Sequence, residues 1–287
     1  MIAGKYHEMK VVRQTPLGYV LELKNEEYFL HQAEATRALE IDETVQAFLY
    51  YDSKKRLTAT MQEAKITTEQ FGWVQVVSVR PELGVFVDIG INKEILIATS
   101  DLPIFEELWP QPGDYLYCRL KESLSHYLFA IIGKPKEFTN EVQKAPESLN
   151  GQKIKATVIR TGKIGTNIIT AEGYLGFIHE SERRTEPRLG EIVEGRVVRV
   201  KENGEINVSL KPQKEVAIVE DSDLILEHLK GRREGAMPLG DKTEADEIRR
   251  VFNMSKSSFK RALGLLMKEG KVYQENGWTY LKDRTES

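Results

Sequence analysis

The chain has 287 residues, of which 40% are hydrophobic and 30% charged, a composition typical of a globular protein with two or more domains. No apolar run approaches the roughly 18 residues of a membrane-spanning helix, and the N-terminus lacks the apolar core of a secretory signal. These features predict a cytoplasmic protein without a membrane partner. The single cysteine excludes an intramolecular disulfide and a thiolate-cluster zinc site.

The net charge of −3 is unevenly distributed along the chain. It is −1 for residues 1–62, −4 for residues 63–138, +3 for residues 139–214 and −1 for residues 215–287. A polyanion would therefore prefer the third segment. These four segments are also the predicted domains, because a repeated order of strands defines the first three and a change to a helical period defines the fourth.

Strand-like runs between residues 5 and 211 repeat three times in the same order. In each copy a first strand is followed by a glycine, Gly18, Gly84 or Gly165, at which a second strand begins, and three further strands follow at similar spacings. Five short antiparallel strands close best as a small barrel without free edges. The sequence therefore predicts a mostly β protein with three tandem five-stranded barrels of the OB type.

The segment "LGVFVDIG" shows the alternation that defines such a strand. Val85, Val87 and Ile89 are expected to point into a core, and Phe86 to point outward. An exposed aromatic ring on a barrel strand can stack on a nucleobase. The alternative is that Phe86 packs under a loop or a neighbouring domain.

The segments "LGVFVDIG…EILIATSDL" and "GYLGFIHESE…RLGEIVEGRVVRVKENGEINVSLKP" resemble the S1-type RNA-binding domain. That family has an exposed aromatic residue on strand two, a Gly-Leu/Phe-Val-His segment on strand three and a basic residue at the start of strand five. The resemblance implies that strands two and three bind single-stranded RNA.

The three copies match this pattern unevenly. In the first copy Tyr19 adjoins the aromatic position, whereas in the second only Phe86 matches and no basic neighbours accompany it. The third copy combines an aromatic residue and a histidine with several arginines, among which we count Arg183, Arg184 and Arg188. We therefore expect the main site in the third copy. The residues expected to bind RNA, from the resemblance and from the charge of the third copy, are Phe177, His179, Arg160, Lys163, Arg196 and Arg199 in the third copy, Phe86 in the second, and Tyr19, His31 and Arg56 in the first.

Residues 215–287 change to a helical period. The runs "DSDLILEHLKGR", with Asp221 or Ser222 as its cap, "DKTEADEIRRVF" and "NMSKSSFKRALGLLMKEG" predict three helices. A hairpin that turns at Asn276-Gly277 follows them. This α+β arrangement resembles a winged helix.

The third of these helices would be the recognition helix. We expect Ser255 to cap it, and Phe259, Leu263, Leu266 and Met267 to face a core. The alternative is that its polar face is only solvated and that the domain docks against proteins. The residues expected to contact nucleic acid are Lys256, Lys260, Arg261 and Lys268.

Three S1-type barrels followed by a winged helix resemble the bacterial conserved virulence factor B family over essentially the full length. This resemblance implies RNA binding and an influence on gene expression. Residues 134–150 read as a linker or short helix.

No catalytic motif is visible. The five histidines lack metal-ligand spacing, and neither a Walker loop nor a dinucleotide fingerprint occurs. We expect a noncatalytic protein without a metal or cofactor. Two other functions remain open, a DNA-binding winged-helix transcription regulator and a protein-interaction scaffold on the ribosome or RNA polymerase.

Overall fold

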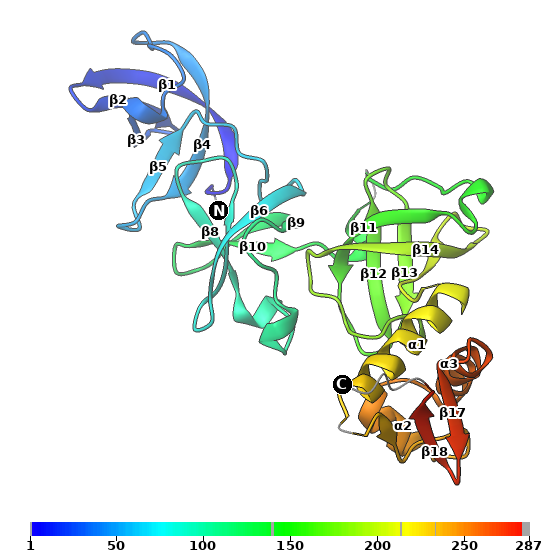
Figure 1. Ribbon diagram of the computed structural model, residues 1–287. Coiled ribbons are helices and arrows are strands. Elements are labelled where there is room, and N and C mark those ends of the chain that lie inside the picture. The colour runs from blue at the N-terminus through cyan, green and yellow to red at the C-terminus, as the bar shows by residue number, and fades with distance from the viewer. Residues whose placement is uncertain (1, 139–140, 213, 233, 283–287) are drawn as a thin grey trace. The chain divides into compact units, whose positions relative to one another are not determined.

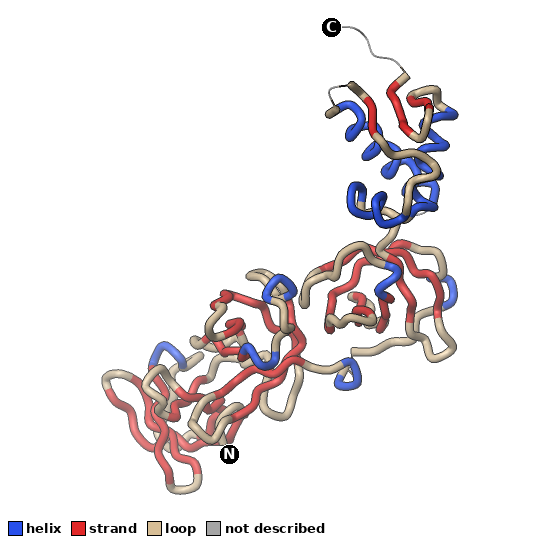
Figure 2. Tube along the Cα trace, turned by 90° about the horizontal axis from the view of Figure 1, so that it is seen from below, coloured by secondary structure: helices blue, strands red, loops and turns tan. Residues whose placement is uncertain are grey.

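The computed structural model describes residues 2–138, 141–212, 214–232 and 234–282. The chain divides into two compact units, Met1–Leu210 and Lys211–Ser287 (Figure 1). In the described part of the chain, the first unit consists of strands and single-turn 3-10 helices, and the α-helices belong to the second (Figure 2).

The first unit contains three closed barrels of five strands each. The strands of the first barrel are β1 (Lys5–Thr15), β2 (Gly18–Leu23), β3 (Glu26–His31), β4 (Thr44–Tyr51) and β5 (Leu57–Thr60). Those of the second are β6 (Gly72–Arg80), β7 (Gly84–Asp88), β8 (Glu94–Ala98), β9 (Tyr115–Glu122) and β10 (Leu128–Ile132). Those of the third are β11 (Lys153–Arg160), β12 (Gly165–Thr170), β13 (Leu175–His179), β14 (Ile192–Val200) and β15 (Ile206–Ser209).

The three barrels close in the same way. The first strand pairs with both the second and the fourth, and the third strand pairs in parallel with the fifth. Val85, Val87 and Ile89 are fully buried, whereas Phe86 is partly exposed, so the predicted alternation of β7 is confirmed. The predicted fold of three five-stranded barrels is therefore confirmed.

The glycine at the start of each second strand is required by close packing. A Cβ atom at Gly18 would lie 2.1 Å from the carbonyl oxygen of Leu30, and one at Gly84 would lie 2.1 Å from that of Ile97. Both glycines also adopt positive φ angles, 152° and 132°. No other residue fits where the second strand passes so close to the third, which explains the repeat in the sequence.

Residues 134–150 were predicted to be a linker or short helix, and their described part contains two single-turn 3-10 helices, Pro135–Glu137 and Glu147–Leu149, that are tied to the neighbouring barrels. Phe138 is fully buried in a cluster with Tyr117 of the second barrel and Ile159 and Ile169 of the third. The segment also hydrogen-bonds to the third barrel, because the Ala145 N–H donates to the Gly204 carbonyl (3.0 Å). The predicted boundary at 138/139 falls beside residues 139–140, outside the described residues. The division into four domains stays a prediction about independent folding.

Limited trypsin digestion of the full chain should cut first near Lys211–Lys214, where the two compact units meet in the sequence. Cuts after the exposed Lys134, Lys136 and Lys144 should come later, since the backbone around them is tied to the second and third barrels. Mass spectrometry of the first fragments checks this order. First fragments ending within 134–150 would contradict it.

The second unit is a winged helix, as predicted. Its elements are α1 (Lys214–Lys230), β16 (Ala236–Met237), α2 (Ala245–Phe252), α3 (Lys256–Lys268), β17 (Val272–Glu275) and β18 (Trp278–Leu281). The strands form one sheet in the order β16-β18-β17. Ser255 caps α3 by accepting a hydrogen bond from the Ser258 N–H (3.1 Å), and the hairpin turns at Asn276 and Gly277, both with positive φ.

Three details of this unit differ from the prediction. Helix α1 begins at Lys214, so Asp221 and Ser222 lie inside it as buried residues and do not cap it. Met267 is 46% exposed and does not belong to the core. Strand β16 was not predicted, because two residues are too few to show a period.

Candidate nucleic-acid interface

A single row of side chains crosses the outer face of the third barrel. Strand pairing places five residues side by side, each directly opposite the next, and all are at least partly exposed. Residues opposite each other in a sheet share a face. The row therefore presents an aromatic ring between two amides, with an arginine at each end. In order, its members are Arg160, Asn167, Phe177, Asn207 and Arg199.

Two β-bulges bring the arginines to this face. The register of β11 shifts between Val158 and Arg160, and that of β14 shifts between Val197 and Arg199. Both valines are fully buried, so regular alternation would also point the arginines inward. The extra residue in each bulge turns the following side chain to the outside.

The ring of Phe177 is held in place by its neighbours. A Cβ atom at Gly165 would lie 2.3 Å from Phe177 Cζ, so the ring lies against the glycine backbone. His179 contacts the ring edge-on, with ring centroids 6.5 Å apart. The histidine is fixed in turn, because its Nδ1 accepts a hydrogen bond from the Ser181 N–H (3.1 Å).

The basic residues of the third barrel fall into two groups. Arg160, Lys163 and Arg199 are exposed, and none has an ion-pair partner among the described residues. Arg183 was counted with them but is buried, where it donates to Thr166 and to the Gly162 carbonyl (2.8 Å). Arg188 pairs with Asp114 of the second barrel (2.6 Å) and so joins the two barrels.

Arg196 differs from the other predicted contacts of the third barrel. It lies in another row of the sheet, opposite Lys153 and Ser209. Its side chain is partly buried, and its Nε has no hydrogen-bond partner in the described part of the chain.

The second barrel has a row at the corresponding position. In order, it consists of Ser78, Phe86, Leu96, Phe129 and Lys121. The Arg80 guanidinium lies over the Phe86 ring, 5.2 Å from its centroid, so the expectation of no basic neighbours was wrong. Phe129 and Lys121 were missed, since only the strand register brings them to Phe86.

The first barrel corrects one predicted residue, Tyr19, and adds another, Phe29. Tyr19 is 5% exposed and belongs to the core, where its hydroxyl accepts from the Leu39 N–H (3.3 Å), so its ring is not offered to a base. Phe29 is 37% exposed and contacts His31 edge-on, as Phe177 contacts His179. The similarity of "YFLH" to "GFIH" could have identified Phe29.

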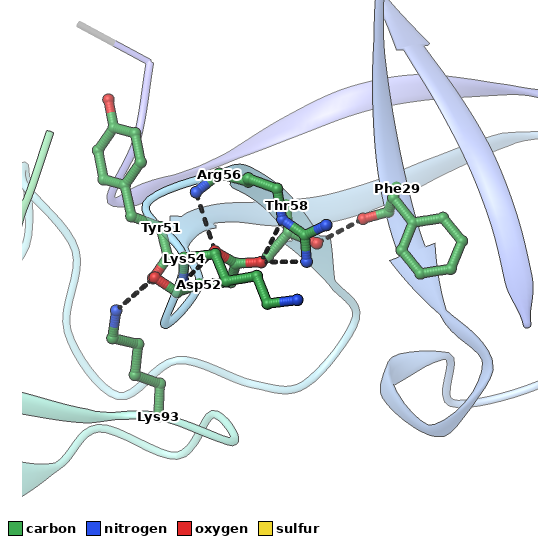
Figure 3. Close-up of polar contacts among 7 residues, drawn as sticks. All are labelled: Phe29, Tyr51, Asp52, Lys54, Arg56, Thr58 and Lys93. Atoms are coloured by element: carbon green, nitrogen blue, oxygen red, sulfur yellow. Dashed lines mark hydrogen bonds and ion pairs between the residues drawn. The ribbon is translucent and has the colours of Figure 1, made fainter.

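Arg56 lies in the hairpin between β4 and β5, where Asp52 binds it (Figure 3). Its Nε and Nη2 donate to Asp52 Oδ2 at 2.8 and 2.6 Å. Burial opposes the charged form of this carboxyl, but hydrogen bonds from the Arg56 backbone and guanidinium outweigh it and keep the pKa of Asp52 below its usual value. Arg56 is therefore exposed but already paired.

Helix α3 carries the four basic residues predicted in the winged helix. Lys260, Arg261 and Lys268 are exposed and Lys256 is partly exposed. The hairpin beside it carries stacked rings, since Tyr280 stacks on both Tyr273 and Trp278. Trp278 is 42% exposed, so one side of this stack is open to solvent.

The cysteine and the possible metal ligands among the described residues do not add a further candidate site. Cys118 is fully buried, and this burial raises the pKa of its thiol. Among the described residues, no group of three His, Cys, Asp or Glu side chains could hold a metal ion. No helix in the described ranges is long and apolar enough to cross a membrane.

Comparisons with known proteins cover almost the whole chain. The matching family models are an S1 domain over residues 3–62, the CvfB first S1-like domain over 71–130, the second domain of virulence regulatory factor CvfB over 138–212 and a CvfB-like winged helix domain over 223–281. S1 and winged-helix domains are nucleic-acid-binding modules.

Relatives and a solved structure match over similar lengths. Uncharacterized protein YitL of Bacillus subtilis is 45% identical, covering 98% of this chain and 94% of its own length. Conserved virulence factor B of Staphylococcus epidermidis RP62A is 34% identical, covering 98% of both chains. A crystal structure of a multidomain protein with nucleic acid binding domains from Streptococcus pneumoniae TIGR4 is 35% identical, with a TM-score of 0.66 over 97% of this chain and 98% of that one. Because this similarity extends through all three barrels and the winged helix, the protein belongs to the conserved virulence factor B family.

Proposed function

We propose that this protein is a noncatalytic, cytoplasmic regulator of gene expression that binds single-stranded RNA mainly through its third barrel and winged helix. The row on the third barrel carries the proposal. There Phe177 lies between Arg160 and Arg199, and neither arginine has an ion-pair partner among the described residues. The names of the relatives, conserved virulence factor and virulence regulatory factor, support a regulatory role.

The row suits binding without strict sequence preference. A base stacked on Phe177 contributes about 1–3 kcal/mol whatever its identity. Arg160 and Arg199 then bind the phosphates that flank the base, and each contact releases counterions. Lys163, in the turn between β11 and β12, extends the positive charge beyond the row.

The amides beside the ring favour RNA over DNA. Asn167 and Asn207 flank Phe177 on the neighbouring strands. An amide offers both a donor and an acceptor, as does the ribose 2′-hydroxyl that DNA lacks. A stacked nucleotide would bring its sugar close to one of these amides.

The charge of α3 supports a second candidate, a DNA-binding transcription regulator. Lys256, Lys260 and Lys268 follow one another at helical spacing along one side, and recognition helices present such a side to the duplex. A scaffold on the ribosome or RNA polymerase is a third candidate, favoured by the exposed Ile104 and Phe105 of the acidic second barrel.

Affinities for single-stranded RNA, single-stranded DNA and duplex DNA of one sequence at matched salt separate these functions. We expect single-stranded RNA to bind tightest, because the aromatic row needs unpaired bases and the amides favour ribose. Duplex DNA that binds at least about tenfold tighter than the RNA would overturn the proposal. In that case a Lys260→Gln change should weaken duplex binding more than Phe177→Ala does. Absence of measurable binding to all three would favour the scaffold.

A further inference from the structure

The hairpin between β4 and β5 of the first barrel carries three consecutive basic residues, Lys54, Lys55 and Arg56, all exposed. Asp52 gives the turn its shape, because its Oδ1 accepts from the Lys54 and Arg56 N–H groups at 2.8 and 2.9 Å (Figure 3). Lys54 and Lys55 have no ion-pair partner in the described part of the chain. The turn is therefore ordered, and the charges of Lys54 and Lys55 are not neutralised by a carboxylate of the described residues.

The second barrel holds this hairpin in place. Lys93 donates to the carbonyl oxygens of Tyr51 and Asp52, at the base of the hairpin (Figure 3). The Tyr51 hydroxyl donates to Glu122 Oε1 of β9 (2.7 Å). Contacts from the β7–β8 loop and from β9 of the second barrel thus fix the position of the hairpin.

The hairpin lies beside the aromatic residues of the second barrel. Lys55 Nζ lies over the Tyr127 ring, 4.7 Å from its centroid. Tyr127 is two residues before Phe129, and their ring centroids are 6.3 Å apart. Phe129 belongs to the row that contains Phe86. The second barrel's own turn, residues 123–127, contains no lysine or arginine, so the first barrel supplies the charge that it lacks.

The same hairpin also continues the face of the first barrel. Arg56 directly precedes β5 and lies two residues before Thr58. Thr58 is paired with the exposed Phe29, whose carbonyl accepts from its Oγ1 (2.7 Å; Figure 3). The basic hairpin therefore stands between exposed aromatic rings of two barrels.

We propose that Lys54, Lys55 and Arg56 of the first barrel, together with Tyr127 and Phe129 of the second, form one composite site for single-stranded RNA. Ammonium and guanidinium groups bind phosphates, while the rings stack on bases. This inference rests on the proposed function and adds a second site to the one around Phe177. An RNA long enough to reach both sites gains affinity through effective concentration.

The test uses the full-length protein and oligouridylates of about 8 and about 24 nucleotides, since one OB barrel covers about 4–16 nucleotides. The double variant Lys54→Gln/Lys55→Gln should lower the affinity for the long RNA about tenfold or more, because bivalent binding is lost. Affinity for the short RNA should change less than about twofold, since the Phe177 site still binds it. The matched control, Lys134→Gln/Lys136→Gln, removes the same charge from exposed positions elsewhere in the first unit. It should leave both affinities unchanged.

Equal effects of the two double variants on the long RNA would overturn the composite site. If instead neither RNA bound the unmodified protein, the proposed function itself would fail. Lys55→Asn is a variant that should fold normally, because φ at this position is 62°, which asparagine tolerates. It therefore separates a loss of binding from a loss of folding. It too should weaken long-RNA binding, while the melting temperature stays the same or rises.

The aromatic half of the site is tested separately. Tyr127→Ala should weaken long-RNA binding without changing its salt dependence, as stacking releases no counterions. Inorganic polyphosphate carries the charges of RNA but no bases, so it should compete poorly at matched charge. Equal competition by polyphosphate, with no effect of Tyr127→Ala, would overturn the composite site as a site for RNA.

Discussion

Replacing Phe177 with alanine should weaken binding of single-stranded RNA about 5- to 150-fold, which corresponds to the 1–3 kcal/mol of one stacked base. The ring lies at the centre of the third-barrel row, between Asn167 and Asn207, with an arginine beyond each amide. Because stacking releases no counterions, the slope of log affinity against log salt should stay the same. Fluorescence anisotropy over a salt series measures both quantities.

Two comparisons isolate this effect. Phe105→Ala removes the same side chain from a position that is 63% exposed outside the aromatic rows, and it should not change the affinity. Arg160→Gln or Arg199→Gln should instead flatten the salt slope by about 0.7 for each phosphate that the variant no longer binds. A changed slope with Phe177→Ala, or an equal loss of affinity with Phe105→Ala, would argue against stacking on Phe177.

Gly165 provides a further variant of the same site. Gly165→Ala would place a Cβ atom 2.3 Å from the Phe177 ring and 2.5 Å from the Ile178 carbonyl oxygen, so both the ring and its strand must shift. We expect it to reduce affinity in the same direction as Phe177→Ala although no aromatic residue is removed. A Gly165→Ala protein with unchanged affinity and stability would show that the position of the ring is unimportant.

Much of the fold could be predicted because close packing leaves traces in the sequence. Gly18, Gly84 and Gly165 recur because the second strand of each barrel passes so close to the third. The alternation around Phe86 predicts which residues of β7 are buried. The turn at Asn276-Gly277 is predictable because both residues tolerate positive φ.

The rows could not be predicted because they depend on strand register. Bulges reverse the side-chain alternation at Arg160 and Arg199, and no residue type marks a bulge in the sequence. Phe129 joins Phe86 only through the pairing of β8 with β10. Tyr19 was misassigned because it lies directly beside the expected position, and neighbouring residues of a strand point to opposite faces.

The remaining differences concern residues that polarity or a polar sequence context predicts at the surface but that the fold buries. Arg183 is buried with its guanidinium bonded to Thr166 and Gly162. Asp221 and Ser222 suit a helix N-cap, but α1 buries both within its length. Phe138 lies in a stretch whose prolines and charges suggest a linker, although the two barrels beside it bury its ring completely.

Phe138→Ala should lower the free energy of unfolding of the first unit by about 3–5 kcal/mol, the usual cost of removing a buried phenylalanine ring. Its ring stacks on Tyr117 at 4.2 Å and contacts Trp73 at 5.9 Å, so it joins the second barrel to the segment leading into the third. Denaturant unfolding followed by tryptophan fluorescence detects the change, as Trp73 lies in the same cluster.

The same experiment decides whether the barrels fold separately. Because all three belong to one compact unit, we expect one cooperative transition for residues 1–210, which Phe138→Ala shifts as a whole. Phe105→Ala, the same substitution at an exposed site, should change stability by less than about 0.5 kcal/mol. If only part of the transition shifted with Phe138→Ala, the barrels would unfold independently and the boundaries predicted from sequence would hold. A shift below about 1 kcal/mol would show that burial of this ring does not stabilise the junction between the second and third barrels.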